Sequence, residues 1–251
     1  MQDLLATLFI LAFLVAPTAS AREVRTLTLN DNDQVDVRVF ATSGGLPLLL
    51  GFPCDEGKSQ SEEATATSLS QDGVEVWMPD MLSAYMLPNV RSSLQQIPTG
   101  ALVALVDAAA ATGKDVYLIA SGPDTELVLR AAAAWEAAHP KGGGLKGAIL
   151  LFPRLNATDP EPGKPPEYVA DVGTTKLPIL VLEAERTPNR WGITHLTKAL
   201  EQGGSPVYAK LIPDVRGYFF KRDDANMPEN VATSQLSGLI KAGLYYLRSV
   251  H

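Results

Sequence analysis

The sequence has few of the residues on which disulfide-stabilised, nucleic-acid-binding or membrane-spanning proteins depend. It contains one cysteine, Cys54, so no disulfide can form within the chain. Acidic residues outnumber basic ones, and the formal net charge of −7 argues against nucleic acid and anionic membrane surfaces as partners. The acidic residues are scattered, so no acidic tail is indicated. The charge balance therefore indicates solubility rather than a type of partner.

Hydrophobic runs are short, and one of them opens the chain. Leu4 to Val15 is an apolar run of about twelve residues, whereas a membrane span needs about 20. A small-residue cleavage pattern, Ala19-Ser20-Ala21, follows it, although no lysine or arginine precedes the run. We therefore expect a signal peptide over residues 1–21, a mature protein without a transmembrane segment from Arg22, and export to the periplasm or the medium. An uncleaved anchor or a buried first helix is the alternative.

Residues 22–251 have the length and composition of one globular domain. About 230 residues suit a single α/β domain with a full core. A hydrophobic content of 46% and a charged content of 20% are ordinary globular values. Short apolar runs alternate with helical patterns, and the runs predict eight strands. These are Val24–Leu29, Val35–Phe40, Leu46–Leu50, Val74–Met78, Val116–Ala120, Gly147–Phe152, Pro178–Glu183 and Val207–Ile212.

Helices between most of these strands predict a mainly parallel sheet that is covered on both faces. They are expected over Ser59–Leu69, Pro98–Ala111, Asp124–Ala138, Gly192–Gln202 and Asn230–Ser249. The first two strands alternate apolar with polar residues, so we expect them to form an N-terminal β-hairpin at the sheet edge. The runs at 46–50, 116–120 and 147–152 are continuously apolar and should lie near the centre. A loop rich in proline and glycine, Asn156 to Lys176, has the length of many active-site lids.

Five segments, in chain order, resemble those of the α/β-hydrolase superfamily. They are Leu48-Leu49-Leu50-Gly51-Phe52-Pro53, Val76-Trp77-Met78-Pro79-Asp80, Val116-Tyr117-Leu118-Ile119-Ala120-Ser121-Gly122, Leu180-Val181-Leu182-Glu183-Ala184-Glu185-Arg186-Thr187-Pro188 and Leu211-Ile212-Pro213-Asp214-Val215-Arg216-Gly217-Tyr218-Phe219. The resemblance covers nearly all of residues 22–251. It implies an α/β-hydrolase-like fold with an oxyanion loop, a nucleophile elbow, an acid and a histidine at successive strand ends.

The chemical residues depart from that pattern. Gly122 stands at the nucleophile position and has no side chain with which to attack. Pro123 follows it and lacks the N–H that would face an oxyanion, a donor worth about 3–4 kcal/mol in hydrolases. Thr187 stands where an aspartate is usual, and Arg216, which stays protonated, stands where the histidine is usual. The sequence therefore predicts a divergent member without the usual Ser-Asp-His triad.

A displaced nucleophile could still be built on Ser121. If the elbow is read one residue earlier, the N–H of Gly122 could serve as the oxyanion donor. The serine would need a histidine as base, and His195 is the candidate; His139 ends a helix and His251 ends the chain, so both are expected to be solvated. The alternative is that Ser121 is a turn residue that caps the following helix.

Cys54 and four carboxylates are expected at the same edge of the sheet. Cys54 could be a nucleophile, but Asp55 and Glu56 would raise its pKa, and an inert, partly buried thiol is the alternative. Asp55, Glu56, Asp80 and Asp124 could meet there. These carboxylates could bind a hard cation, but they have no ligand spacing of the EF-hand kind, so no metal is predicted.

Arg216 could hold an anion at this edge, or form a salt bridge with Asp80 or Asp124. Segment 218–220 is expected to pack in the core. The residues expected to line the cleft are Gly51, Phe52, Cys54, Asp80, Ser121, Gly122, Asp124, Thr187 and Arg216.

The vacant triad positions predict an exported, non-catalytic protein that binds an unidentified small molecule or protein partner through this cleft, without a cofactor. The alternative is an active serine- or cysteine-dependent hydrolase of esterase or peptidase type, built on Ser121 or Cys54. A third possibility is a thiol- or carboxylate-based enzyme of another kind on a similar sheet.

Overall fold

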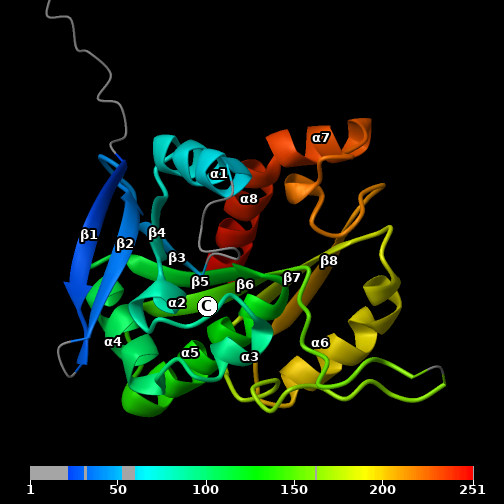
Figure 1. Cartoon of the computed structure of the whole chain (residues 1–251), viewed down its shortest axis with the longest axis horizontal. Helices are drawn as coiled ribbons and strands as arrows, with labels where there is room; N and C mark the ends of the chain where they lie inside the picture. The colour runs from blue at the N-terminus through cyan, green and yellow to red at the C-terminus, as the bar shows by residue number, and fades with distance from the viewer. Residues whose placement is uncertain (1–21, 31–32, 53–59, 162, 251) are drawn as a thin grey trace, which may run out of the picture.

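After an opening hairpin, strands and helices alternate along the chain (Figure 1). The computed structural model describes residues 22–30, 33–52, 60–161 and 163–250. The strands are β1 (Arg22–Thr28), β2 (Gln34–Phe40), β3 (Pro47–Phe52), β4 (Glu75–Pro79), β5 (Asp115–Ser121), β6 (Leu145–Leu151), β7 (Ile179–Ala184) and β8 (Val207–Ile212). The α-helices are α1 (Gln60–Gln71), α2 (Met81–Ala84), α3 (Arg91–Leu94), α4 (Thr99–Ala110), α5 (Thr125–Ala138), α6 (Ile193–Glu201), α7 (Met227–Ser234) and α8 (Leu236–Ser249).

The strands of the described residues form one eight-stranded sheet in the order β1-β2-β4-β3-β5-β6-β7-β8. β2 pairs antiparallel with β1 and with β4, and all other neighbouring strands are parallel. The predicted mainly parallel sheet with an N-terminal hairpin at its edge is confirmed. The continuously apolar strands β3, β5 and β6 lie in the middle, where both faces are covered.

Helices cover both faces of the sheet, with α1 and α8 on one side and α4, α5 and α6 on the other (Figure 1). Successive side chains of a strand point to opposite faces. In β5, Leu118 and Ala120 therefore pack toward α4 and α5, while Ile119 and Ser121 face α1 and α8. The direction of each strand residue decides which functional side chains can meet.

The single closing helix expected over Asn230–Ser249 is wrong, because two helices meet at Gln235. α7 starts earlier than expected, at Met227, through a capping box. The Asn226 side chain accepts a hydrogen bond from Glu229 N at 3.0 Å, and the Glu229 carboxylate accepts one from Asn226 N at 2.9 Å. At Gln235 the backbone leaves helical geometry (φ −100°, ψ 2°). α8 then runs against the sheet.

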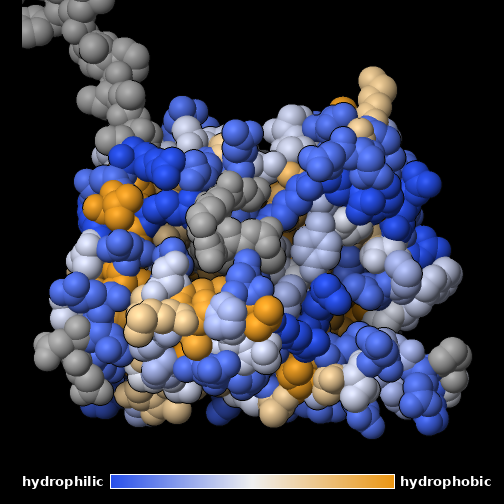
Figure 2. Space-filling model, in the orientation of Figure 1, coloured by the Kyte–Doolittle hydropathy of each residue, from blue (hydrophilic) through white to orange (hydrophobic). Residues whose placement is uncertain are grey.

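No helix among the described residues is both long and apolar enough to cross a membrane. Figure 2 shows a face on which hydrophobic side chains occur in small groups among hydrophilic ones. Trp191 is one of the large hydrophobic side chains that remain exposed, and it borders a cavity described below.

Candidate functional site

The turn from β5 into α5 is the place where the resemblance puts a nucleophile. The chain passes through a short 3₁₀ helix, η3 (Gly122–Asp124), between Ser121 and Thr125. Gly122 has φ +65°, a left-handed conformation suited to a sharp strand-to-helix turn. Its carbonyl accepts hydrogen bonds from Thr125 Oγ1 at 2.6 Å and from Arg154 N at 3.1 Å. The backbone therefore has an elbow at the residue that carries no side chain.

Tyr218 occupies the space beside Gly122 that a nucleophile side chain would need. A Cβ atom added to Gly122 would overlap the Tyr218 hydroxyl oxygen and would lie 3.0 Å from the ring carbon that bears it. Tyr218 comes from the loop after β8, and its ring centroid lies 5.7 Å from that of Phe152. Phe219 and Phe220 are buried around the same phenylalanine, so the expected core packing is confirmed for these two residues, while Tyr218 is half-buried against them.

Ser121 lies on the other side of the elbow, in a small apolar cavity. It is 5% exposed, and the cavity of about 80 Å³ that it lines also includes Gly51 and Phe52. Its Oγ has no hydrogen-bond partner among the described residues. The interpretation of Ser121 as a helix cap is therefore wrong, since Ser121 makes no capping bond. Thr125 makes the side-chain hydrogen bond of this turn instead.

The two remaining triad positions, 187 and 216, lie in segments that pack together beyond β7 and β8. Arg186 N donates to Val215 O at 2.9 Å. Thr187 begins the 3₁₀ helix η4 (Pro188–Gly192) without a side-chain capping bond. A threonine hydroxyl carries no charge with which to hold an imidazolium, and a guanidinium cannot accept a proton. The two segments therefore lie side by side, with a threonine and an arginine at the two positions.

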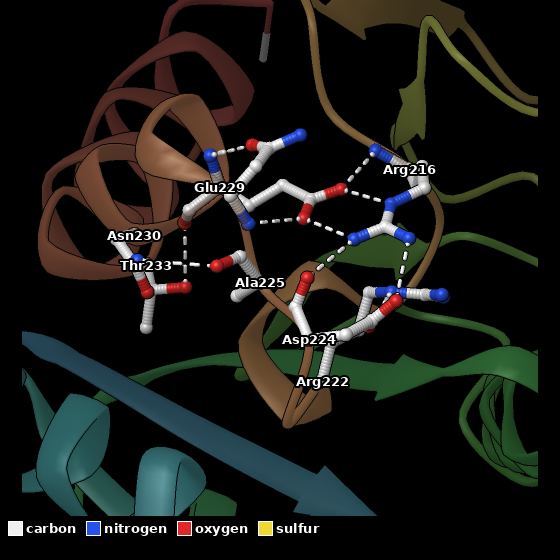
Figure 3. Close-up of polar contacts among 8 residues, drawn as sticks. Arg216, Arg222, Asp224, Ala225, Glu229, Asn230 and Thr233 are labelled. Atoms are coloured by element: carbon white, nitrogen blue, oxygen red, sulfur yellow. Dashed lines mark hydrogen bonds and ion pairs between the residues drawn. The ribbon is translucent and has the colours of Figure 1, made fainter.

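Arg216 is held by two acidic residues of the chain's last segment (Figure 3). Its Nε and Nη2 donate to the carboxylate oxygens of Glu229 at 2.6 and 2.7 Å, and its Nη1 donates to Asp224 at 2.9 Å. The Glu229 side chain is 0% exposed, and the Arg216 guanidinium lowers the pKa of that carboxyl to about 2. Arg216 forms a salt bridge as expected, but Asp80 and Asp124 are the wrong partners. Glu229 reaches it because the start of α7 packs beside this loop.

Asp80 and Asp124 line the same small cavity at the carboxyl edge of the sheet. Both line a cavity of about 20 Å³ with Phe52. Asp80 caps α2 by accepting a hydrogen bond from Ser83 N at 3.1 Å. No group of three or more metal-ligating side chains occurs within the described ranges. The candidates 54–56 and His251 lie outside those ranges.

A larger cavity, of about 470 Å³, lies beyond β7 on the α5–α6 face. Glu183 of β7 lines it and is 1% exposed, and burial raises the pKa of its carboxyl to about 7. Its Oε1 accepts a hydrogen bond from the adjacent N–H of Ala184 at 2.8 Å. Sequence reasoning did not single out Glu183. The available signal was one acidic residue inside an otherwise apolar run, Pro178 to Ala184.

The structure does not bring Ser121 and His195 together. His195 is an exposed residue of α6 that lines the larger cavity, whereas Ser121 lines the smaller cavity on the opposite face. A serine nucleophile and its base must lie within hydrogen-bond reach. His139 is not simply solvated, because its ring stacks on Trp135 with 4.4 Å between centroids.

Comparisons with known proteins identify the fold. No family model and no curated protein sequence matches this chain. Among solved structures, esterase Est22 superposes with a TM-score of 0.65 at 14% identity, over 90% of this chain and 82% of its own. Carboxyl esterase 2 from Tuber melanosporum has a TM-score of 0.64 at 13% identity, over 89% of this chain and 87% of its own. A dienelactone hydrolase from Anabaena variabilis has a TM-score of 0.62 at 14% identity, over 88% and 96%. These likenesses, together with the strand order and the elbow, show that the chain has the α/β-hydrolase fold.

Proposed function

We propose that this protein uses the α/β-hydrolase fold to bind a ligand and does not hydrolyse esters through the elbow at residue 122. One observation carries the proposal, namely that the Tyr218 hydroxyl occupies the space that any side chain at Gly122 would need. A nucleophile there would have to displace a tyrosine that packs against a buried phenylalanine. The elbow is thus filled from within the chain.

The neighbouring positions support the same proposal. Pro123 has no N–H to donate to an oxyanion. Arg216, at the position of the usual histidine, forms an ion pair with the buried Glu229. A histidine at position 216 would leave the Glu229 carboxylate buried without this partner. Thr187 supplies no carboxylate. Because the groups of a triad act as a unit, restoring one of them would gain little.

The second candidate is an active hydrolase with a displaced catalytic set. The structural neighbours are named as esterases and dienelactone hydrolases, and they favour this candidate over a binding protein. Ser121 is the described residue that suits it, because its buried Oγ is without a partner in a cavity. Against it, none of the histidines within the described ranges lines that cavity. Cys54 is the other nucleophile of this candidate.

Covalent labelling with a fluorophosphonate probe separates the two candidates. We expect no labelling of the wild type beyond that of heat-denatured protein. The matched variants are Ser121→Ala and Ser93→Ala, because Ser93 is a second buried serine whose Oγ has no partner among the described residues. Labelling that persists in the Ser93 variant and disappears in the Ser121 variant would establish the hydrolase instead.

We also propose that the protein is exported and works in the periplasm or outside the cell. The support is the sequence of residues 1–21, in which an apolar run precedes Ala19-Ser20-Ala21. The single cysteine is compatible with that role, because not every exported protein depends on a disulfide.

A further inference from the structure

The larger cavity has the size and walls of a small-molecule site. Its volume of about 470 Å³ falls within the range of roughly 300–1,000 Å³ that ligand pockets span. The lining residues come from the loop after β6, from the turn through η4 into α6, and from the end of β7. Proline and aliphatic side chains make up much of the lining, namely Pro153, Leu155, Pro160, Pro166, Pro188, Ile193 and Leu196.

Glu183 is the only acidic residue among the described residues that line this cavity. The preceding β7 residues that face the same way, Ile179 and Val181, pack in the core, so an aliphatic side chain would continue the pattern. Glu183 instead places a carboxyl at the cavity with 1% exposure. Within the described residues it accepts a hydrogen bond from the N–H of Ala184, and no ion pair neutralises it. A buried carboxylate without a cationic partner is costly unless a ligand supplies one.

The other titratable groups of the cavity do not supply that cation. Lys164 stands at the rim and pairs with Glu161 at 2.5 Å. His195 is exposed on α6, and burial raises the pKa of the Tyr168 hydroxyl to about 12, so the phenol stays neutral. Burial and the Ala184 N–H set the pKa of Glu183, without a contribution from another charged side chain. Neither Lys164 nor His195, the two basic side chains of the described walls, forms an ion pair with Glu183.

We propose that this cavity binds a small organic amine as its ammonium form, with the ammonium group at Glu183. The apolar part of the amine packs on Tyr168, Trp191 and the prolines of the wall. An ammonium donates charge-assisted hydrogen bonds to the carboxylate and removes the need to bury it unpaired. The overall charge of −7 also attracts cations. The inference names a ligand class for the binding role proposed above and rests on that role.

Three probes of one size and different charge test the ligand class. They are benzylamine, benzyl alcohol and benzoate, titrated by calorimetry into the full mature chain at pH 8, where the Glu183 carboxyl is mostly ionised. We expect benzylamine to bind and the other two to bind at least tenfold more weakly. Benzoate or benzyl alcohol binding as tightly as benzylamine would overturn the proposal, as would no binding of benzylamine.

Two variants assign the binding to Glu183. Glu183→Gln keeps the shape and removes the charge, and we expect it to weaken benzylamine binding by at least about tenfold, as for loss of one charge-assisted hydrogen bond. Glu167→Gln removes an exposed carboxylate from the loop after β6. Glu167 does not line the cavity, so this variant should bind benzylamine as the wild type does. If Glu183→Gln does not fold, Trp191→Ala serves, because Trp191 is 76% exposed and lines the cavity; it should also weaken binding. Unchanged affinity in the folded variant contradicts the proposal.

The outcome is independent of the labelling experiment. Fluorophosphonate labelling through Ser121 would defeat the non-catalytic function and would leave amine binding at Glu183 to be decided by calorimetry. Failure of benzylamine to bind would defeat this inference and would leave the filled elbow at Gly122 unaffected.

Discussion

Gly122 and Tyr218 are in close contact at the turn between β5 and α5. Gly122 keeps the left-handed conformation of an elbow, while the Tyr218 hydroxyl lies where a Cβ substituent would go. Gly113 offers a control, because it has φ +76° and open space where an added Cβ would lie. The two glycines therefore separate backbone strain from steric overlap.

We predict that Gly122→Ala destabilises the protein more than Gly113→Ala does. The positive φ should cost each variant about 1–2 kcal/mol, and overlap with Tyr218 should cost Gly122→Ala roughly a further 1–3 kcal/mol. Urea unfolding measures both. In a Tyr218→Ala background the difference between the two glycine variants should shrink toward zero. Equal losses in the wild-type background would show that Tyr218 does not fill the position.

Glu183 should make stability depend on pH near neutrality. Its pKa rises from an ordinary 4.5 to about 7 on folding, so the folded protein holds this proton more tightly than the unfolded chain does. The stabilisation is complete below about pH 4.5 and is lost as the pH rises through 7, by about 3 kcal/mol. Urea unfolding of Glu183→Gln should lack this loss between pH 5 and pH 8, whereas Glu167→Gln should retain it. An identical pH profile in wild type and Glu183→Gln would refute the assignment.

For single residues, the sequence predicts their place relative to the strands better than it predicts which side chains they contact. The motif order places Gly122, Pro123 and Arg216 correctly relative to the strands, because each follows a strand that its apolar run identifies. Tyr218 at Gly122 and Glu229 at Arg216 could not be foreseen, since both contacts depend on how the segment after β8 folds back. Glu183 stands out in the sequence only as one acidic residue in an apolar run, and a strand pattern does not show that the end of the strand borders a cavity.

Among the elements, the segment from β8 to α7 departs most from the expected pattern. Glu229 serves twice, as the capping-box residue of α7 and as the ion-pair partner of Arg216. One carboxylate thereby ties the start of a helix to the loop that carries Tyr218. The sequence predicts a single closing helix because Asn230–Ser249 is continuously compatible with helix, and the capping residue Asn226 lies before that range.

We predict that Glu229→Gln destabilises the protein by about 3 kcal/mol, because it leaves the Arg216 guanidinium beside a neutral, buried amide. Asp224→Asn removes the outer partner of the same arginine, and it should cost much less because the Asp224 side chain is 66% exposed. Thermal or urea unfolding compares the two variants. Similar losses in both would show that burial does not distinguish the two partners.

The strands were predictable to within a few residues, whereas short helices were not. Continuous apolar runs identify β3, β5 and β6 because both faces of these strands are covered. α2 and α3 are four residues each and carry no periodic pattern long enough to detect. The alternating and continuous apolar runs predicted which strands lie at the edge and which lie near the centre, whereas the full strand order is known only from the structure.

For the whole molecule, the sheet separates two candidate sites. The Ser121 cavity lies under α1 and α8, and the Glu183 cavity lies toward α6. A catalytic set that joins Ser121 to His195 would have to cross the sheet. The division follows from strand alternation, which sends Ser121 and Glu183 to opposite faces.

The proposed export predicts where the isolated protein begins. If residues 1–21 are a signal peptide, protein isolated from its native host should begin at or near Arg22. Intact-mass measurement of the extracytoplasmic fraction checks this. A full-length mass in the cytosolic fraction would contradict the proposal.

Hydrolysis of p-nitrophenyl acetate and butyrate is the most direct test of the central claim that the filled elbow is not catalytic. The assay compares the wild type with Ser121→Ala and Cys54→Ala. Because Gly122, Pro123 and Arg216 supply neither nucleophile, oxyanion donor nor base, we predict rates at the background of the buffer for all three proteins. Wild-type turnover on the order of 1 s⁻¹ or more, within the usual range of enzymes, that is lost in either variant would contradict the account and identify the nucleophile.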